Sequence, residues 1–284
     1  MRNILVATDL TINSAHAMDR AIQLADVTQA MLHVFHQAPD FRLPGTKQKD
    51  EDSFSNAAKS KITEFIQQNK RSANITFEIH IESKGRIHEL IDEHAMKIQA
   101  DLVVMGITNK SKDTPSFVST TIERVIKTGN YPVLMVSRKV TGLYLKALFY
   151  LDMDDLAGDA FNLAAQFNPK ADFLLLPAFN VLTESSDGLW SRFKTKRYNR
   201  RTERFIDEAK EVLKKHQGDP DKIQYHDIHD RGANLLLAEA QKSATDLVCI
   251  DLHRYTASLH LKVKGFAGKL LEHPPSDVLI MKRV

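Results

Sequence analysis

Short apolar runs alternate along the chain with longer stretches in which apolar residues recur every three or four positions. The runs are rich in β-branched residues and end at polar residues, which is typical of strands buried in a sheet. The stretches carry their apolar residues on one face, as Ile87, Ile91 and Ala95 do, which is typical of amphipathic helices. In the first half, the pattern predicts strands over residues 3–8, 30–35, 75–81, 102–105 and 132–136.

Helices are predicted between these strands, and Ser14 and Ser53 are suitable N-cap residues for two of them. The helices cover residues 14–25, 53–69, 87–98 and 119–127. A polar stretch over residues 37–52 contains two prolines and a glycine, so it predicts a loop. Strands that alternate with helices form a parallel sheet through right-handed crossovers, with helices on both faces.

The second half repeats this order. Asp101-Leu-Val-Val-Met-Gly106 returns about 145 residues later as Asp246-Leu-Val-Cys-Ile-Asp251. Strands are predicted near residues 146–151, 173–177, 223–228, 247–250 and 278–281. Helices are predicted near residues 157–167, 200–216, 233–242 and 263–272. The fold class is therefore α/β, with two tandem, open, mostly parallel five-stranded domains over residues 1–140 and 144–284.

Composition agrees with a soluble globular protein, since 43% of the 284 residues are hydrophobic and 26% are charged. The net charge of +3 is too small to indicate nucleic-acid binding by itself. The single cysteine, Cys249, lies inside an apolar run, so we expect a packing role and a reducing compartment. No signal-peptide pattern opens the chain, and no apolar run approaches the roughly 18 residues of a membrane span. We expect a cytoplasmic protein with no membrane partner.

Candidate chemistry lies at the carboxyl ends of the predicted strands, because open α/β sheets bind ligands there. Asp9 could accept hydrogen bonds from a ribose or an adenine amine, or it could close a turn. Gly106 could let a ligand approach the backbone, or it could serve a turn. Ser119, Thr120 and Thr121 begin a helix, where N–H groups and hydroxyls either bind an anion or cap the helix.

These residues together resemble a known family. A strand ending in Asp9, the Met105-Gly106 pair, a polar loop, Ser119-Thr120 and the run Tyr131-Pro-Val-Leu-Met-Val136 look like the universal stress protein (UspA) family. The resemblance covers both halves. It implies Rossmann-like domains of the adenine-nucleotide α-hydrolase type, packed as a pseudo-dimer with the fifth strands at the domain interface.

The resemblance also implies a nucleotide site in the first half. Nucleotide-binding members carry a glycine, two residues, a glycine, nine residues, a glycine and a Ser or Thr, and this pattern falls on Gly106, Asn109, Ser119 and Thr120. Two glycines are thus replaced, although Asn109 tolerates a left-handed backbone. The resemblance assigns ATP, with Mg²⁺ if it binds, to Ala7, Thr8, Asp9, Val34, Met105, Gly106, Asn109, Ser119, Thr120 and Thr121.

In the second half, the same spacing falls on Asp251, Arg254, Lys264 and Gly265. A carboxylate repels phosphates, so we expect no ordinary ATP site there. Another polyphosphate or acidic ligand stays open, because Arg254 and Lys264 could reverse the local charge.

Other candidates are weaker. The run His226-Asp-Ile-His-Asp230 invites a metal interpretation, but it overlaps a strand end, and alternation divides its side chains between two faces. His33 is expected to be a satisfied core residue. No metal ligand is therefore assigned. The basic stretch from Arg192 to Arg204 could bind an acidic partner, although a solvated surface is the simpler interpretation.

The sequence thus predicts a stress-response protein that pairs its two domains within the chain and binds a nucleotide in the first domain only. A homodimer is compatible with this prediction, and no specific nucleic acid is expected. One alternative is a slow ATPase, in which Asp113 or Glu123 would have to serve as the base, and no catalytic residue is assigned. The other alternative is a binding module for an acidic partner or small ligand.

Overall fold

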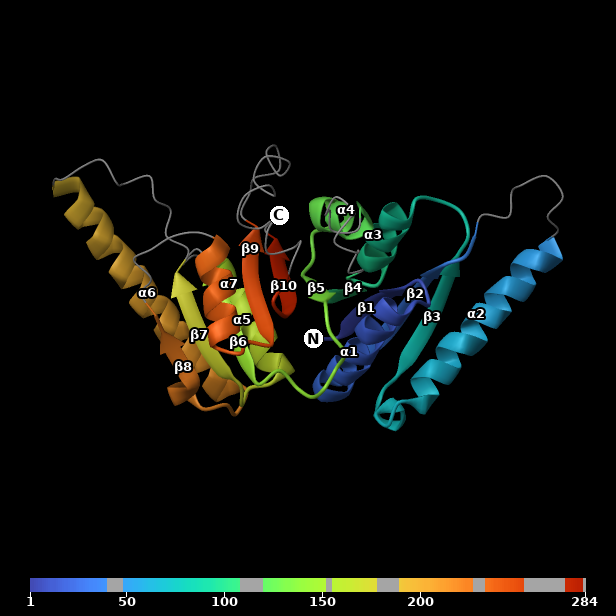
Figure 1. Ribbon diagram of the computed structural model, residues 1–284, viewed down its shortest axis with the longest axis horizontal. Helices are drawn as coiled ribbons and strands as arrows, with labels where there is room; N and C mark the ends of the chain where they lie inside the picture. The colour runs from blue at the N-terminus through green and yellow to red at the C-terminus, as the bar shows by residue number, and fades with distance from the viewer. Residues whose placement is uncertain are drawn as a thin grey trace. The chain divides into compact units, whose positions relative to one another are not determined.

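The computed structural model describes residues 1–39, 48–107, 120–151, 155–177, 189–226, 233–252 and 274–282. The chain divides into two compact units, Met1–Gly142 and Leu143–Val284. Figure 1 shows that each unit contains its own strands and helices.

The first unit is built on five parallel strands in the order β3-β2-β1-β4-β5. These are β1 (Asn3–Thr8), β2 (Met31–Gln37), β3 (Phe77–Glu82), β4 (Leu102–Gly106) and β5 (Val133–Val136). The apolar runs of β1, β2 and β4 are almost entirely buried. Strands covered on both faces have no solvent side, which explains why their sequences do not alternate.

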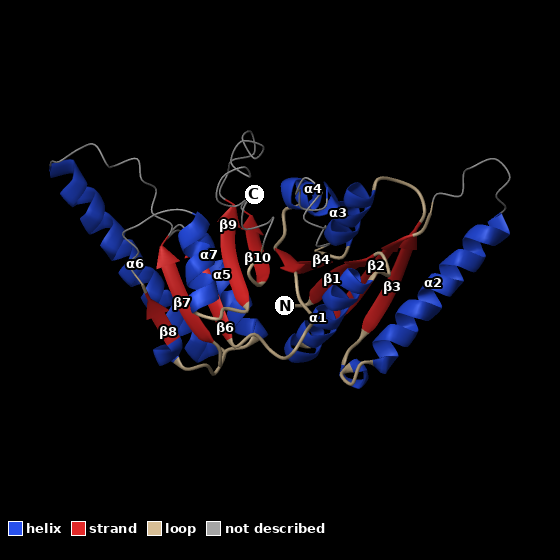
Figure 2. Cartoon of the chain, viewed as in Figure 1, coloured by secondary structure: helices blue, strands red, loops and turns tan. Residues whose placement is uncertain are grey.

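Helices cover both faces of this sheet (Figure 2). They are α1 (Ile12–Thr28), α2 (Gln48–Gln68), α3 (Ile87–Lys97) and α4 (Thr120–Thr128). Thr8 contacts Ser14 of α1 and His36 stacks on Phe54 of α2, so even-numbered side chains of β1 and β2 face these two helices. Phe35, one residue away on β2, contacts His94 of α3 on the opposite face.

The second unit repeats the topology, with parallel strands in the order β10-β9-β6-β7-β8. They are β6 (Lys146–Leu151), β7 (Asp172–Pro177), β8 (Ile223–Tyr225), β9 (Leu247–Leu252) and β10 (Asp277–Lys282). The helices are α5 (Asp155–Phe167), α6 (Leu189–Lys215) and α7 (Ala233–Lys242). The rings of Phe149, Phe161 and Phe173 pack against one another at tilted angles in the core between the sheet and α5. The predicted helix at residues 263–272 lies outside the described residues.

Three predicted helix starts are wrong. α1 begins at Ile12 after the N-cap Thr11, and Ser14 lies inside the first turn with its hydroxyl donating to the Thr11 carbonyl. α2 begins at Gln48, inside the predicted loop over residues 37–52, and α6 begins at Leu189, before its predicted start near residue 200. Both added segments are rich in polar residues, among them Lys, Arg, Glu and Gln, which form helices readily. Their polarity led to the prediction that these segments are not helical.

One aspartate in each unit fastens the start of the central strand. The Asp101 carboxylate, just before β4, accepts hydrogen bonds from the backbone N–H groups of Arg2 (2.5 Å) and Asn3 (2.9 Å). The Asp246 carboxylate, just before β9, accepts from Leu145 (2.7 Å) and Lys146 (3.0 Å). The aspartates of the sequence repeat are therefore structural in both units.

Candidate functional site

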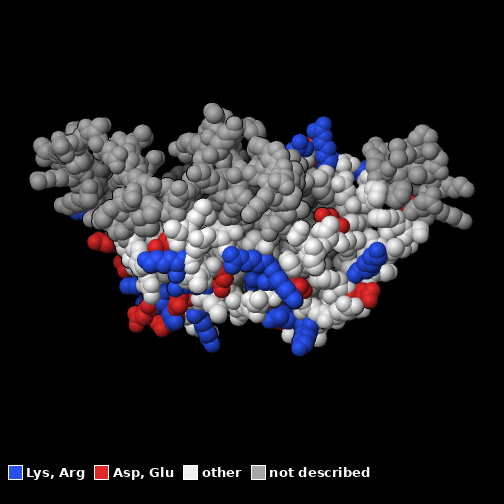
Figure 3. Space-filling view, viewed as in Figure 1, with Lys and Arg blue, Asp and Glu red and all other residues white. Residues whose placement is uncertain are grey.

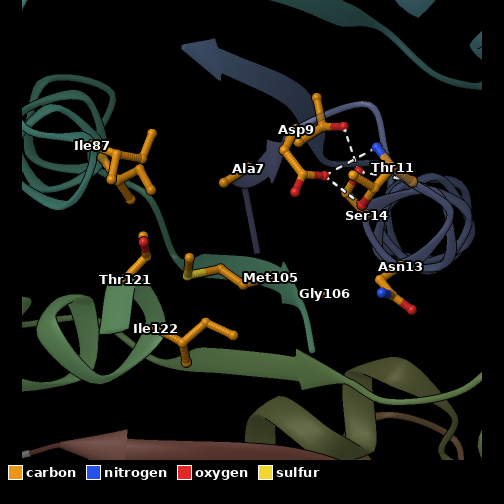
Figure 4. Close-up of a pocket in the computed structure, with 12 residues that line it drawn as sticks. Ala7, Asp9, Thr11, Asn13, Ser14, Ile87, Met105, Gly106, Thr121 and Ile122 are labelled. Atoms are coloured by element: carbon orange, nitrogen blue, oxygen red, sulfur yellow. Dashed lines mark hydrogen bonds between the residues drawn. The ribbon is translucent and has the colours of Figure 1, made fainter. Parts of the chain in front are cut away.

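A cavity of about 130 Å³ opens in the first unit at the carboxyl ends of β1 and β4 (Figure 4). The chain leaves β1 toward β2 on one side, and β4 adjoins β1 on the other. The cavity therefore lies where the strand order reverses, which is where open α/β sheets place their ligand sites. Its lining is Ala7, Thr8, Asp9, Thr11, Asn13, Ser14, Ile87, Ile91, Met105, Gly106, Thr121 and Ile122.

One side of the cavity is polar because the chain turns sharply from β1 into α1. Asp9 Oδ1 accepts hydrogen bonds from the backbone N–H (3.0 Å) and the hydroxyl (2.6 Å) of Thr11. In this turn the Asp9 side chain accepts the hydrogen bond that a backbone carbonyl would otherwise accept. The turn fixes the conformation of the residues that lead into α1. Figure 4 shows Asp9, Thr11 and Ser14 gathered on this side. Asp9 thus closes a turn, and its exposed carboxylate also lines the cavity.

Hydrogen bonds keep the Asp9 carboxylate ionised. Burial raises its pKa, but hydrogen bonds from the Thr11 side chain and from backbone N–H groups, with the Ser14 hydroxyl nearby, outweigh that effect, so the pKa lies below its usual value. Hydrogen bonds that favour the charged form act in this direction. Asp9 is therefore an acceptor at neutral pH and a weak base.

The opposite side of the cavity is apolar. Ile87 and Ile91 come from one face of α3, Ile122 comes from α4, and Met105 comes from β4. Figure 4 shows Ile87 across the cavity from Asp9, with Met105 between them. The Thr121 hydroxyl adds a polar group next to this wall. The site can therefore hold a flat apolar group beside one that donates hydrogen bonds.

Packing against α1 explains why position 106 is a glycine. A Cβ at this position would lie 2.4 Å from the carbonyl oxygen of Asn13 and 3.1 Å from the Ser14 nitrogen. Atoms at such distances overlap, so only glycine lets the end of β4 approach the first turn of α1. The residue lines the cavity, but its lack of a side chain is explained by α1.

The structure brings six of the ten predicted site residues to the cavity, namely Ala7, Thr8, Asp9, Met105, Gly106 and Thr121. Val34 has no exposed surface and does not line it. Asn109 and Ser119 lie outside the described residues, and only the backbone of Thr120 is described.

Sequence reasoning missed the other half of the lining. Thr11, Asn13 and Ser14 follow directly from the end of a predicted strand, so a correct helix start would have found them. Ile87 and Ile91 were predicted to be core residues of a helix. Their position at the site depends on where α3 packs, which spacing alone does not tell.

Other sequence candidates stand apart from this cavity. Glu123, the candidate base of an ATPase, does not line it, and Asp113 lies outside the described residues. His226 is half-exposed and lies 3.8 Å from Glu239, while residues 227–230 are not described. Cys249 is fully buried, and burial raises the pKa of its thiol. The residues that correspond to a second-unit site, including Asp152 and Arg254, lie outside the described residues.

The basic stretch belongs to α6. Arg200 and Arg204 are exposed, and Arg204 donates to Glu208 at 2.7 Å. On the face that Figure 3 shows, described Lys and Arg side chains are interspersed with Asp and Glu. That mixture does not mark out a surface for an acidic partner on this face. Among the described helices, none has the length and apolar character needed to cross a membrane.

The fold and the cavity define an α/β domain with a candidate ligand site at its strand-order reversal. The model of the Universal stress protein family matches residues 1–137. Residues 1–137 therefore match the family that was predicted from the sequence. No curated protein matches the chain.

Solved structures match the full length of the chain. A universal stress protein from Archaeoglobus fulgidus DSM 4304 is 15% identical with a TM-score of 0.69, covering 99% of this chain and 98% of that one. A putative universal stress protein from Pseudomonas aeruginosa UCBPP-PA14 is 18% identical with a TM-score of 0.64, covering 99% and 93%. These likenesses confirm the predicted fold class for both halves.

A universal stress protein from Archaeoglobus fulgidus in complex with dAMP matches 48% of this chain and 97% of its own, at 19% identity and a TM-score of 0.37. The dAMP is a ligand of that protein. A likeness at this TM-score carries no argument about a ligand of this chain.

Proposed function

We propose that the first unit binds an adenine nucleotide in the cavity at the ends of β1 and β4, and that this binding serves a stress-response role without turnover. The observation that carries the proposal is the cavity itself, which combines an ionised acceptor with an apolar wall at the strand-order reversal. The match of residues 1–137 to the universal stress protein family supports the choice of an adenine nucleotide.

The two sides of the cavity suit the two parts of a nucleoside. The base would lie against Ile87, Met105 and Ile122, because a flat aromatic ring buries well against apolar side chains. The ribose hydroxyls would donate to the Asp9 carboxylate. Charge-assisted hydrogen bonds of this kind are about twice as strong as neutral ones.

The described cavity holds only part of a nucleotide. Its volume of about 130 Å³ is below the roughly 300–1,000 Å³ usual for small-molecule sites. The phosphates would extend toward the start of α4, where N–H groups favour an anion. Asn109, Ser119 and Thr120 are proposed to contact the phosphates, and this assignment rests on the family pattern alone.

Restriction to the first unit rests on sequence. Asp251, Arg254 and Lys264 replace the phosphate-approach positions in the second half. A carboxylate next to a phosphate is repulsive. We extend the nucleotide proposal to the first unit only.

Binding without turnover follows from the groups that line the cavity. Among its lining residues, Asp9 is the one titratable side chain, and its lowered pKa makes it a weak general base. Incubation of the protein with ATP and Mg²⁺ should release phosphate at the background rate. Release well above background that is lost in Asp9→Asn would overturn this part of the proposal.

Calorimetric titration of the full chain with ATP and Mg²⁺, ADP, AMP and adenosine tests the proposal. We expect binding with one site per chain, weakened about 10-fold in Asp9→Asn through the lost charge-assisted bond. Thr121→Trp should abolish it by filling the cavity. Gly106 is unsuitable for this test, because any side chain there displaces α1.

Asp221→Asn is the matched control, since Asp221 is an exposed carboxylate in the second unit. It should bind as the unaltered protein does. Absence of heat with all four ligands at millimolar concentration would remove nucleotide binding. Equal loss in Asp221→Asn and Asp9→Asn would remove this site.

A further inference from the structure

Three histidines converge at one place in the first unit, away from the nucleotide cavity lining. His33 lies on β2, His80 on β3 and His94 on α3 (Figure 1 shows these elements). One ring nitrogen from each lies within 4.8 Å of the others. The three residues come from separate elements, so the fold itself brings them together.

Strand register and helix spacing explain this convergence. In the parallel pairing of β2 with β3, His33 lies opposite Glu78 and Phe35 lies opposite His80. Paired residues share a face, so His33, Glu78 and His80 all face the same side of the sheet. His94 follows Ile91 by three positions on α3, and it packs onto Phe35 on that side.

Glu78 completes a triangle of ligand atoms with two of the histidines. His33 Nδ1 lies 3.3 Å from His80 Nε2, and Glu78 Oε2 lies 3.6 Å from the first and 3.5 Å from the second. An ion in the centre of such a triangle is about 2.0 Å from each atom, the distance at which Zn²⁺ binds imidazole nitrogen and carboxylate oxygen. These atoms need almost no movement to share one ion.

His94 is placed to contribute the remaining ligand from the buried side. Its ring centroid lies 4.0 Å from that of His80, and the residue is only 8% exposed. Its Nε2 is buried and has no hydrogen-bond partner among the described residues. A buried ring nitrogen without a partner is unfavourable, and binding a metal ion would remove that cost.

Burial favours the neutral form of all three histidines. Burial lowers the pKa of His33, and it lowers that of His94 to about 4, with His80, His33 and Lys97 adding to the effect on His94. Burial together with the charges of His33 and Lys97 also lowers the pKa of His80, against the opposing Glu78. Lowered pKa values favour the neutral form of an imidazole, which is the form that offers a lone pair to a metal ion.

We propose that the first unit binds one divalent transition-metal ion of the zinc type through His33, His80 and His94, with Glu78 as the ligand on the exposed side. Three imidazoles and one carboxylate match the nitrogen and oxygen donors that Zn²⁺ takes in four-coordinate sites. Imidazole donors disfavour Mg²⁺ and Ca²⁺, which prefer oxygen. The ion would join β2, β3 and α3, and so would fix the helix that also supplies Ile87 and Ile91 to the cavity.

Metal titration of the chelator-stripped full chain tests this proposal. We expect one Zn²⁺ per chain by competition with a chelating dye, and Co²⁺ should give the visible absorption of a four-coordinate site that Zn²⁺ then displaces. Loss of a residue that only hydrogen-bonds a metal ligand lowers metal affinity by about 10–100-fold. Loss of a ligand itself should cost more, so His94→Leu and His80→Gln should each lower the Zn²⁺ affinity by at least about 100-fold. Glu78→Gln should lose less.

His88→Gln is the matched control, because His88 is a buried histidine on the same helix but outside the cluster. It should keep the site, and Zn²⁺ should raise its thermal midpoint as in the unaltered protein. If His94→Leu does not fold, as judged by circular dichroism, His80→Gln decides, since the His80 side chain is 25% exposed. Equal Zn²⁺ affinity in His80→Gln and the unaltered protein, or no tight binding in either, would overturn the proposal.

Discussion

At the residue scale, Gly106 and Gly158 should respond in opposite ways when a side chain is added. A Cβ on Gly106 would collide with the carbonyl oxygen of Asn13, whereas a Cβ on Gly158, inside α5, would meet nothing within 4 Å. Gly106→Ala should therefore lower the free energy of unfolding by about 1–3 kcal/mol. Gly158→Ala should raise it by up to about 1 kcal/mol, because glycine is a poor helix former. Denaturant melts of both variants check the two signs, and a neutral Gly106→Ala would contradict the close approach of α1.

Cys249 gives a single-residue probe of the second unit. Its side chain is fully buried in β9, and burial raises the pKa of its thiol. The reactive species is the thiolate, so labelling requires the strand to open. A thiol reagent should modify the native protein more than about 1,000-fold slower than the unfolded chain, because stable domains open that rarely. Rapid labelling of the folded protein would contradict the burial of this strand.

At the element scale, Asp101 and Asp246 hold the first strand of each unit against its neighbour. Each carboxylate accepts two backbone N–H groups. Asp101→Asn and Asp246→Asn should each cost about 1 kcal/mol of unfolding free energy, because a charged acceptor becomes neutral while the size is kept.

Thermal and denaturant melts measure this cost. Asp207→Asn on α6 is the control, since Asp207 is exposed, and a surface substitution of this kind changes stability by less than about 0.5 kcal/mol. A cost for Asp207→Asn as large as for the other two would indicate a general charge effect in place of the specific hydrogen bonds.

At the scale of the whole molecule, each unit has its own sheet and core. Local openings of such units follow their own stability. Asp246→Asn should therefore speed the labelling of Cys249 about fivefold, the factor that corresponds to about 1 kcal/mol. Asp101→Asn, in the other unit, should leave the rate unchanged. Equal acceleration by both variants would show that the two units open together.

The sequence predicted the strands well and the helix starts poorly, and the cause is physical. A buried parallel strand is a short apolar run whose ends are marked by polar residues, so Leu102 and Val133 mark their strands directly. A surface helix such as the beginning of α2 has no apolar run to mark it. Its start depends on propensity and on contacts such as that between Phe54 and His36, 18 residues away.

The candidate site was predictable to the extent that it lies at strand ends. Asp9 and Gly106 were predicted because the carboxyl edge of a parallel sheet can be derived from strand order, and both line the cavity. Ala7 and Met105 also line it, but they were named from the family resemblance alone. Val34 was predicted from its place near a strand end and also from the family resemblance, yet its side chain is fully buried in β2. The helices that pack over a strand decide whether its end is open, and spacing does not contain that information.

By itself, the sequence determined the α/β class and the tandem repeat, because local periodicity reports which face of each element is buried. The family was indicated by the resemblance of its motifs. The tertiary structure alone decided why particular residues occupy their positions. Gly106 lies against the first turn of α1, and Asp101 accepts a hydrogen bond from the start of β1. His33 contacts His80, which is 47 positions along the chain, and His94 completes their cluster. Such pairings depend on strand register and helix packing, which join residues distant in sequence, and no local pattern records them.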